Sequence, residues 1–150
     1  MVEITSARVR LRPFGSDDLT TFAAYRCDPE VARYQSWDST YSMTDAHRFF
    51  ESQTSLVFGL PGDWFQLAIV DRKVGTLCGD CAVRVTADQP ETAEVGITLA
   101  RTSQGRGLAT EALIALLTGL FVEADWFKGE WSTLRIYAML NREWRDPRRG

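Results

Sequence analysis

The sequence predicts a mixed α+β fold in one domain, with a mostly antiparallel sheet flanked by helices. Apolar runs separated by short turn signals predict three consecutive antiparallel strands at 64–70, 74–85 and 92–99. A helix-period run of apolar residues from 105 to about 123 then leads to an apolar segment at 133–140, which indicates one parallel β-α-β pair. The length of 150 residues and the 45% hydrophobic content are typical of a single core.

The composition limits the classes of protein to which this chain can belong. The formal net charge is −3, so the chain has no broad basic excess to displace counterions from nucleic acid. No apolar run reaches the length of about eighteen residues that indicates a membrane span, and the N-terminus lacks the apolar core of a signal peptide. We therefore expect a cytoplasmic protein with neither nucleic acid nor a membrane as partner.

The cysteines do not indicate redox chemistry or a metal. Of the three cysteines, only Cys78 and Cys81 lie close together in the sequence. They fall in a strand-like run, where residues three apart are expected to point to opposite faces. The chain has one histidine, which makes a four-ligand zinc site improbable. We expect no metal.

The first half of the chain predicts one strand and three helices. Arginines alternate with apolar residues over 8–12 and a proline follows, which is typical of a half-buried strand. A helix is expected over 16–26, with a serine as its N-cap. The Asp-Pro-Glu sequence at 28–30 predicts the start of a short second helix. Thr44 is the candidate cap of a third helix over 45–55.

A glycine turn at 104–107 leads directly into the long apolar helix and is the strongest functional signal. The first turn of a helix has backbone N–H groups without partners and a partial positive charge, so it attracts phosphate. Gly105 and Gly107 lack a Cβ, which lets the backbone approach a phosphate closely and adopt positive φ. Arg106 adds a positive charge beside the turn. The pattern indicates a pyrophosphate site, and a plain structural turn is the alternative.

The spacing of these glycines excludes two common nucleotide-binding motifs. Neither G-x-G-x-x-G nor G-x-x-x-x-G-K-[ST] is present. The pattern that is present is Q-x-x-G-x-A, formed by Gln104, Gly107 and Ala109. It resembles the acyl-CoA-binding motif [QR]-x-x-G-x-[GA] of the GNAT (Gcn5-related) N-acetyltransferases.

Other segments strengthen this resemblance. The segment Ala-Glu-Val-Gly-Ile-Thr-Leu at 93–99 resembles the central strand of the family. Residues 6–19, with Ser-Ala-Arg-Val-Arg-Leu-Arg-Pro-Phe followed by Asp-Asp-Leu, resemble the opening of its ribosomal-protein N-acetyltransferase (RimJ/RimL-like) branch. Residues 28–37 and 135–138 continue the likeness, which covers roughly residues 5–141.

The resemblance implies a GNAT acyl-CoA N-acyltransferase fold in a single domain over residues 1–150, with acetyl-CoA as co-substrate and no metal. In that family the pantetheine arm of CoA lies between two splayed parallel strands and pairs with the first of them. The pyrophosphate binds the amides of the glycine turn and of the helix start. The positions that match CoA-binding residues are Ile97, Thr98, Leu99, Gln104, Gly105, Arg106, Gly107, Leu108, Ala109, Thr110 and Asn141.

The implied reaction is direct attack of a primary amine, on a protein N-terminus or a small molecule, on the acetyl thioester in a ternary complex. The resemblance gives a backbone N–H of residues 97–99 as the oxyanion donor. Glu94 is the candidate general base, acting directly or through water, because a carboxylate on a half-buried strand can have a raised pKa. The alternative is that Glu94 only bonds a neighbouring loop or orients a substrate. Tyr34 and Trp37 lie on the loop that borders the acceptor pocket in the family and are the candidate substrate-binding residues.

The sequence departs from the family pattern after Asn141. Trp144 stands where the family has a serine, and the helix and strand that follow in the family are missing, so we expect residues 142–150 to be a divergent or truncated tail. Solvent or a hydroxyl such as Tyr137 is then left as the general acid. An exposed edge of the last strand predicts a homodimer or a swapped assembly. A catalytically weak CoA-binding or sensing protein, and a structural or interaction domain, stay open as alternatives to an enzyme.

Overall fold

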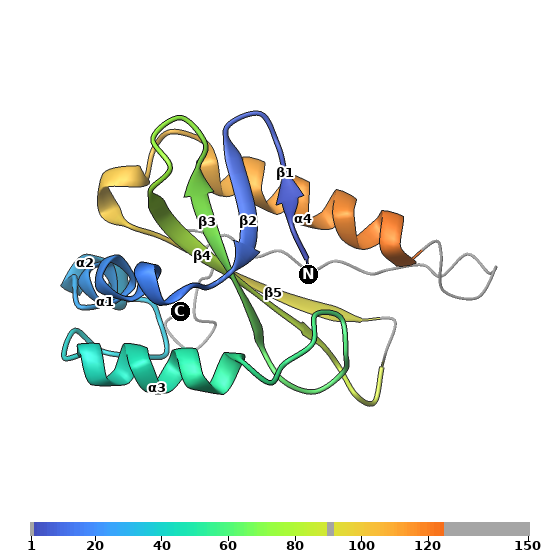
Figure 1. The fold of residues 1–150 in the computed structure, drawn as a ribbon, viewed down its shortest axis with the longest axis horizontal. Coiled ribbons are helices and arrows are strands. Elements are labelled where there is room, and N and C mark those ends of the chain that lie inside the picture. Colours follow the sequence, from blue (N-terminus) through green and yellow to red (C-terminus); the bar gives the residue numbers. More distant parts are fainter. Residues whose placement is uncertain (1, 90–91, 125–150) are drawn as a thin grey trace, which may run out of the picture.

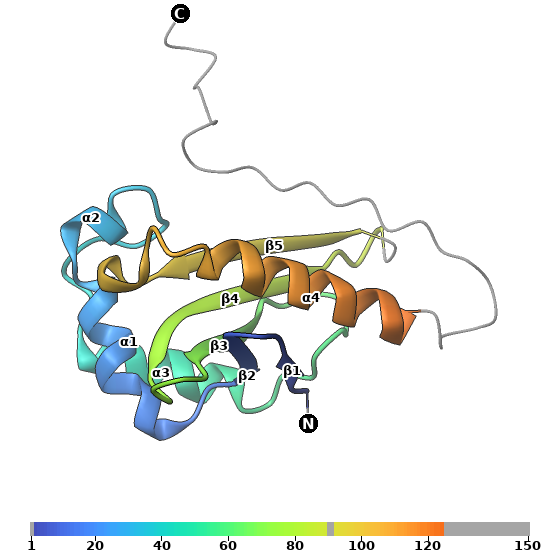
Figure 2. The same cartoon turned by 90° about the horizontal axis from the view of Figure 1, so that it is seen from above.

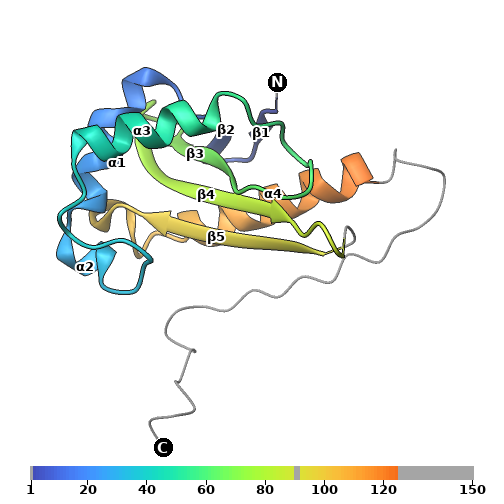
Figure 3. The same ribbon diagram turned by 90° about the horizontal axis from the view of Figure 1, so that it is seen from below.

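The computed structural model describes residues 2–89 and 92–124. The strands of this part form one antiparallel sheet in the order β1-β2-β3-β4-β5 (Figure 1). They are β1 (Ile4–Thr5), β2 (Val9–Pro13), β3 (Phe65–Asp71), β4 (Leu77–Val85) and β5 (Ala93–Leu99), and the α-helices are α1 (Leu19–Arg26), α2 (Pro29–Ala32), α3 (Met43–Gln53) and α4 (Leu108–Ala124). Two short 3₁₀ turns, η1 (Ser16–Asp18) and η2 (Arg101–Ser103), precede α1 and α4. Helix α4 lies along one face of the sheet, and α1 and α3 lie against the other (Figures 2 and 3).

One apolar stripe holds α4 to the sheet. Leu108, Ala112 and Leu116 are each fully buried, and their spacing of four residues places them on one face of the helix. They share a core cluster with Leu11 of β2 and Leu67 of β3. Burying a leucine side chain contributes roughly 1.5–3 kcal/mol. This stripe therefore fixes the N-terminal end of α4 relative to the strands.

Aromatic packing covers the opposite face of the sheet. Phe22 of α1 is fully buried. Its ring lies edge-on to Phe14 at 4.8 Å and stacks on Phe49 of α3 at 5.0 Å, measured between ring centroids. Ala68 and Val70 of β3 belong to the same cluster. This packing positions α1, and with it the short α2, near the end of the sheet where β5 leads into α4 (Figure 3).

The predicted antiparallel strands at 64–70, 74–85 and 92–99 are confirmed as β3, β4 and β5. Strand β4 begins three residues later than predicted, because the chain turns just before it and Gly75 has a φ of +73°. The sequence does not predict β1, since two residues are too short to show a period.

The helix starts illustrate where capping rules succeed and fail. Helix α2 begins at the predicted Asp-Pro-Glu sequence, where Asp28 is the N-cap and its carboxylate accepts a hydrogen bond from the N–H of Glu30 at 3.0 Å. The prediction of Thr44 as the cap of α3 is wrong. Ser42 caps this helix, and its side chain and that of Asp45 form a reciprocal capping box.

The prediction that Cys78 and Cys81 point to opposite faces is also wrong. Both thiols are buried in the core cluster under α4. The pairing of β3 with β4 shifts register between Ile69, opposite Gly79, and Val70, opposite Leu77, so Cys78 is the extra residue of a β-bulge. The bulge breaks the alternation along β4 and lets both cysteines share a face. Burial raises the pKa of Cys78 to about 11 and that of Cys81 to about 12. Neither thiol is a nucleophile at neutral pH.

The last part of the predicted fold lies outside the described residues. This applies to the strand at 133–140 and its parallel pairing with β5, to Asn141, and to the divergent tail at 142–150. The homodimer or swapped assembly inferred from that region stays a prediction. Within 2–89 and 92–124, no helix combines the length and the apolar character needed to cross a bilayer.

Candidate active site

A cleft of about 1130 Å³ opens where β5 ends and α4 begins. Nine of the eleven predicted CoA-binding residues line it: Ile97, Thr98, Leu99, Gln104, Gly105, Gly107, Leu108, Ala109 and Thr110. Residues of α2 and the loop after it, including Glu30, Val31 and Tyr34, contribute further lining. The structure thus brings the strand end, the glycine turn and the helix start into one concave site, as predicted.

The glycine turn has the backbone conformation that its sequence predicts. Gly105 and Gly107 have φ values of +74° and +76°, in the region that side chains with a Cβ disfavour. The first α-helical hydrogen bond of α4 runs from the N–H of Glu111 to the carbonyl of Gly107 at 3.1 Å. The N–H groups of residues 108–110 therefore have no partner within the helix. Residues 107–110 line the cleft, and we call their backbone N–H groups the donor set, because such groups can bind an anion.

Gln104 closes the turn rather than extending into it. Its side-chain amide donates to the carbonyl of Leu99 at 3.0 Å. This bond joins the end of β5 to the beginning of the glycine turn across η2. The glutamine therefore fixes the distance between the strand and the donor set.

Strand β5 presents backbone groups toward the cleft. The N–H of Ala100 donates to the carbonyl of Cys78 at 3.0 Å, and the register pairs Leu99 with Gly79. In an antiparallel pair, hydrogen-bonded and non-hydrogen-bonded positions alternate, so the N–H and C=O groups of Ile97 and Leu99 point away from β4. Among the described strands, β5 has a neighbour on the β4 side alone. An extended ligand arm can pair with this edge.

Arg106 does not line this cleft, unlike its predicted neighbours. Its Nη2 lies 3.2 Å from Oδ2 of Asp71 at the end of β3. It shares a smaller pocket of about 350 Å³ with Arg8, Arg72 and Lys73. Because its side chain turns to Asp71, the residues of the turn that line the cleft are Gln104 and the two glycines.

Glu94 is more exposed than predicted. Its side chain is 45% exposed, and Oε2 lies 2.5 Å from Nη2 and 3.1 Å from Nε of Arg84, the residue opposite it on β4. The side chains of Glu94 and Thr98 are on the same face of β5, since they are four residues apart. Glu94 lies five residues from Leu99, or about 17 Å along the strand. Its role as general base stays a prediction.

Of the two predicted acceptor-binding residues, only one lines the cleft in the structure. Tyr34 is 60% exposed and lines the cleft. Trp37 does not line the cleft; its Nε1–H donates to the carbonyl of Arg26 at 3.1 Å, and its ring lies 3.8 Å from the guanidinium carbon of the same arginine. This stacking is a cation–π contact. Trp37 thus holds Arg26 in place.

The sequence does not predict a buried polar network beside this site. Asp80 of β4 is 2% exposed and accepts hydrogen bonds from the hydroxyl of Tyr25 and the amide of Gln66, and Nη2 of Arg26 lies 3.4 Å from it. Burial raises the pKa of Asp80, and burial together with the Asp80 carboxylate raises the pKa of Tyr25 well above its usual value. Asp80 pairs with Thr98 across the sheet. The sequence signal that could have indicated this network is the carboxylate of Asp80 inside an apolar strand.

The comparisons with known proteins identify the class of this protein. A profile of the family described as acetyltransferase (GNAT) domain matches residues 8–140. The chain therefore belongs to the GNAT acetyltransferases, and the predicted family and α+β fold are confirmed. Within the described ranges, no group of three or more His, Cys, Asp or Glu side chains is placed to hold a metal ion.

Individual relatives agree with this assignment. An uncharacterized N-acetyltransferase of Bacillus licheniformis, p20, is 25% identical over 117 residues, which are 78% of this chain and 65% of the relative. The chain thus spans slightly less than two thirds of that relative's length.

Solved structures share the fold. An acetyltransferase of the GNAT family from Bacillus anthracis aligns with a TM-score of 0.68 and 20% identity, over 83% of this chain and 69% of its own. RimL, a ribosomal L7/L12 α-N-protein acetyltransferase in complex with coenzyme A, aligns with a TM-score of 0.68 and 17% identity, over 83% and 70%. RimL belongs to the branch that the N-terminal segment of this chain resembles.

Proposed function

We propose that the protein is an acetyl-CoA-dependent N-acetyltransferase that acts on a primary amine. One observation carries this proposal: the cleft joins an outward-facing strand edge at Ile97–Leu99 to the anion-binding donor set at Gly107–Thr110. CoA requires both features, because its pantetheine arm carries amides and its pyrophosphate carries negative charge. Membership of the family supports the same ligand.

The proposed reaction needs few groups from the protein. The nitrogen lone pair of a neutral amine attacks the thioester carbon, the C–S bond breaks, and the thiolate of CoA leaves. The amine proton passes to a base, for which Glu94 is the candidate, and the thiolate is protonated by solvent or by a hydroxyl. An N–H on the β5 edge stabilises the oxyanion. Holding both substrates in the cleft supplies much of the acceleration.

The first experiment is a calorimetric titration with acetyl-CoA. We expect saturable one-to-one binding that Gly107→Val abolishes. Valine at a φ of +76° is strained and its Cβ would lie 3.4 Å from Nη2 of Arg8, so the turn must change its conformation. Gly75→Val is the matched control. Gly75 has a φ of +73° in the turn before β4, so its replacement introduces similar strain outside the cleft. No binding by the folded unmodified protein would refute the proposal.

The second experiment separates an enzyme from a CoA-binding protein. Glu94→Gln should lower the rate at least tenfold while leaving the affinity for CoA unchanged, since Glu94 does not line the CoA cleft. An unchanged rate would exclude Glu94 as the base. Because RimL is an α-N-protein acetyltransferase, the amine screen should begin with peptide N-termini and continue with small amines. CoA binding without turnover on any amine would favour the sensing protein.

A further inference from the structure

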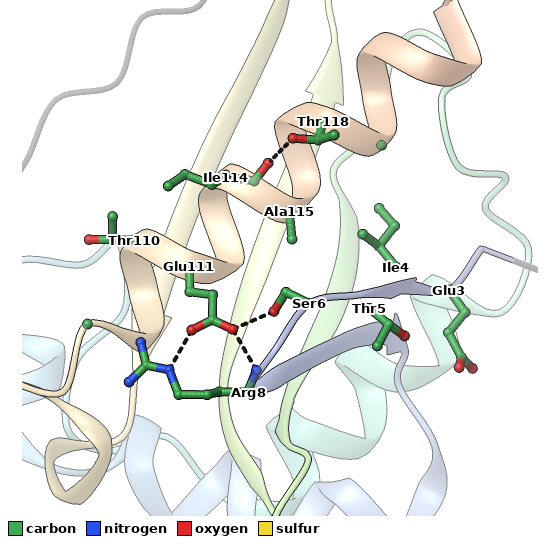
Figure 4. A pocket seen from close by; sticks show the side chains of 12 residues that line it. Glu3, Ile4, Thr5, Ser6, Arg8, Thr110, Glu111, Ile114, Ala115 and Thr118 are labelled. Atoms are coloured by element: carbon green, nitrogen blue, oxygen red, sulfur yellow. Dashed lines mark hydrogen bonds and ion pairs between the residues drawn. The ribbon is translucent and has the colours of Figure 1, made fainter.

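The side chain of Arg8, the residue just before β2, extends to the glycine turn and contacts it on the side that faces β1 and β2 (Figure 4). Its Nε donates to Oε2 of Glu111 at 2.6 Å, and its Nη1 donates to the carbonyl of Arg106 at 2.8 Å. A Cβ on Gly107 would lie 3.4 Å from Nη2 of the same arginine. One guanidinium thus connects the first turn of α4 to the loop that precedes it.

Glu111 receives further donors on the same side. Its Oε1 accepts from the hydroxyl of Ser6 at 2.7 Å and from the backbone N–H of Arg8 at 2.6 Å (Figure 4). The hydrogen bond from Ser6, with those from Arg8, lowers the pKa of Glu111 to about 2. The carboxylate is therefore ionised at neutral pH and binds Arg8 through charge-assisted hydrogen bonds. These residues line a groove of about 780 Å³ between β1 and α4.

The bond from Arg8 to the carbonyl of Arg106 has a geometric consequence for the cleft. The peptide bond is planar and trans, so the carbonyl of residue 106 and the N–H of Gly107 point in opposite directions. The hydrogen bond from Arg8 holds the carbonyl of Arg106 on the side of the turn that faces Arg8. The N–H of Gly107 is thereby directed away from Arg8. Among the described residues, no acceptor takes this N–H.

We propose that Arg8 and Glu111 form a positioning pair that orients the amide of Gly107 for the pyrophosphate of CoA. The inference rests on the proposed function and assigns roles to residues outside the cleft. Arg8 acts through the peptide group that it holds, and Glu111 acts by holding Arg8. The pair keeps the donor set ordered before the ligand arrives, which reduces the entropic cost of binding.

The variant Arg8→Lys tests whether the planar guanidinium of Arg8 or only its positive charge is needed for CoA binding. Arg8→Lys keeps the positive charge but cannot donate to Glu111 and to the Arg106 carbonyl with a planar fork. We expect Arg8→Lys and Arg8→Gln to weaken CoA binding by a similar factor of at least ten in calorimetry. Adding Glu111→Gln to Arg8→Lys should weaken binding by less than a further twofold, because both side chains act on one element.

The control is an ion pair made by another arginine of the same N-terminal segment. Arg12 of β2 donates to both carboxylate oxygens of Asp18, at 2.7 and 2.9 Å, and neither residue lines the cleft. Arg12→Lys should lower the melting temperature and leave the affinity for CoA within twofold of the unmodified protein. All titrations are made at a temperature where circular dichroism shows each variant to be folded, so a loss of affinity does not report unfolding.

Three outcomes would overturn the inference. Unchanged CoA affinity in Arg8→Lys would show that the planar guanidinium of Arg8 is not needed. Tenfold tighter binding by Arg8→Lys than by Arg8→Gln would show that the charge alone matters. An equal loss of affinity in Arg12→Lys would show a general effect of stability. Failure of the unmodified protein to bind CoA would instead refute the proposed function on which the inference rests.

Discussion

Replacing Gly79 with alanine should separate β5 from β4 at the cleft. A Cβ at this position would lie 2.2 Å from the carbonyl oxygen of Thr98, and 2.6 and 2.9 Å from side-chain and Cα atoms of Leu99. An ordinary contact between carbon and oxygen is about 3.3 Å, so the end of β5 must move by about 1 Å. Two of the three clashing atoms belong to the backbone, which cannot move by a rotamer change.

The energetic cost follows from that displacement. Overpacking typically costs about 1–3 kcal/mol, and weakening the hydrogen bond from Ala100 to Cys78 adds about 1 kcal/mol. We expect the free energy of unfolding to fall by about 2–4 kcal/mol. With a slope of about 2 kcal/mol per M, the urea midpoint should fall by roughly 1–2 M. Affinity for CoA should fall as well, because the strand edge and the glycine turn are displaced from each other.

Gly96→Ala is the matched control for this experiment. Gly96 lies on the neighbouring strand, and a Cβ there would meet only the Cβ of Ala82 at 3.9 Å, an ordinary contact. Its urea midpoint, followed by tryptophan fluorescence, should stay the same or rise slightly, because alanine restricts the unfolded chain. A Gly79→Ala variant as stable as Gly96→Ala would refute the steric reasoning.

Three further predictions concern protonation and burial. The folded-state pKa of Glu111 is depressed from 4.5 to about 2, so its contribution to stability is present above pH 4.5 and lost as pH falls toward 2. The urea midpoint of Glu111→Gln should therefore fall less over that range than that of the unmodified protein. With a thiol reagent at neutral pH, exposed Cys27 should react at once and the two buried thiols of β4 should react only after unfolding; rapid reaction of all three would contradict the structure. Tyr25→Phe removes a donor to the buried carboxylate of Asp80 and should lower the free energy of unfolding, measured in urea, by about 1.5–3 kcal/mol. Tyr34→Phe, at an exposed side chain, should lower it by less than about 0.5 kcal/mol. Equal effects of the two changes would contradict the burial of the network.

Periodicity and local chemistry were sufficient to predict most of the described fold. The meander of β3, β4 and β5 and the helix α4 have repeats that are visible within one segment. The glycine turn is equally local, because positive φ at Gly105 and Gly107 depends on their own lack of a Cβ. The positions predicted to bind CoA came from the resemblance to the GNAT family, and nine of them line one cleft.

The features that the sequence did not predict depend on distant partners. The bulge before Gly79 becomes visible only when β3 is paired with β4. The exposure of Glu94 depends on Arg84 across the sheet. Arg8 and Glu111 are 103 residues apart, so an alternating arginine near the N-terminus could indicate a strand but not the turn that it supports. A periodic pattern within one segment cannot show which residues of distant segments contact each other.

The contact between Arg8 and Glu111 also has a consequence for synthesis of the chain. At about 5–20 residues per second, translation from one to the other takes roughly 5–20 s. The sheet strands β2 to β5 all precede α4 in the chain, and they can pair while the glycine turn is still inside the ribosome. The anion-binding end of the cleft is completed only when α4 emerges and docks against the segment that contains Arg8, which is made 103 residues before Glu111. A nascent chain whose β5 has left the ribosome while its glycine turn has not can therefore form the sheet but has no ordered site for CoA.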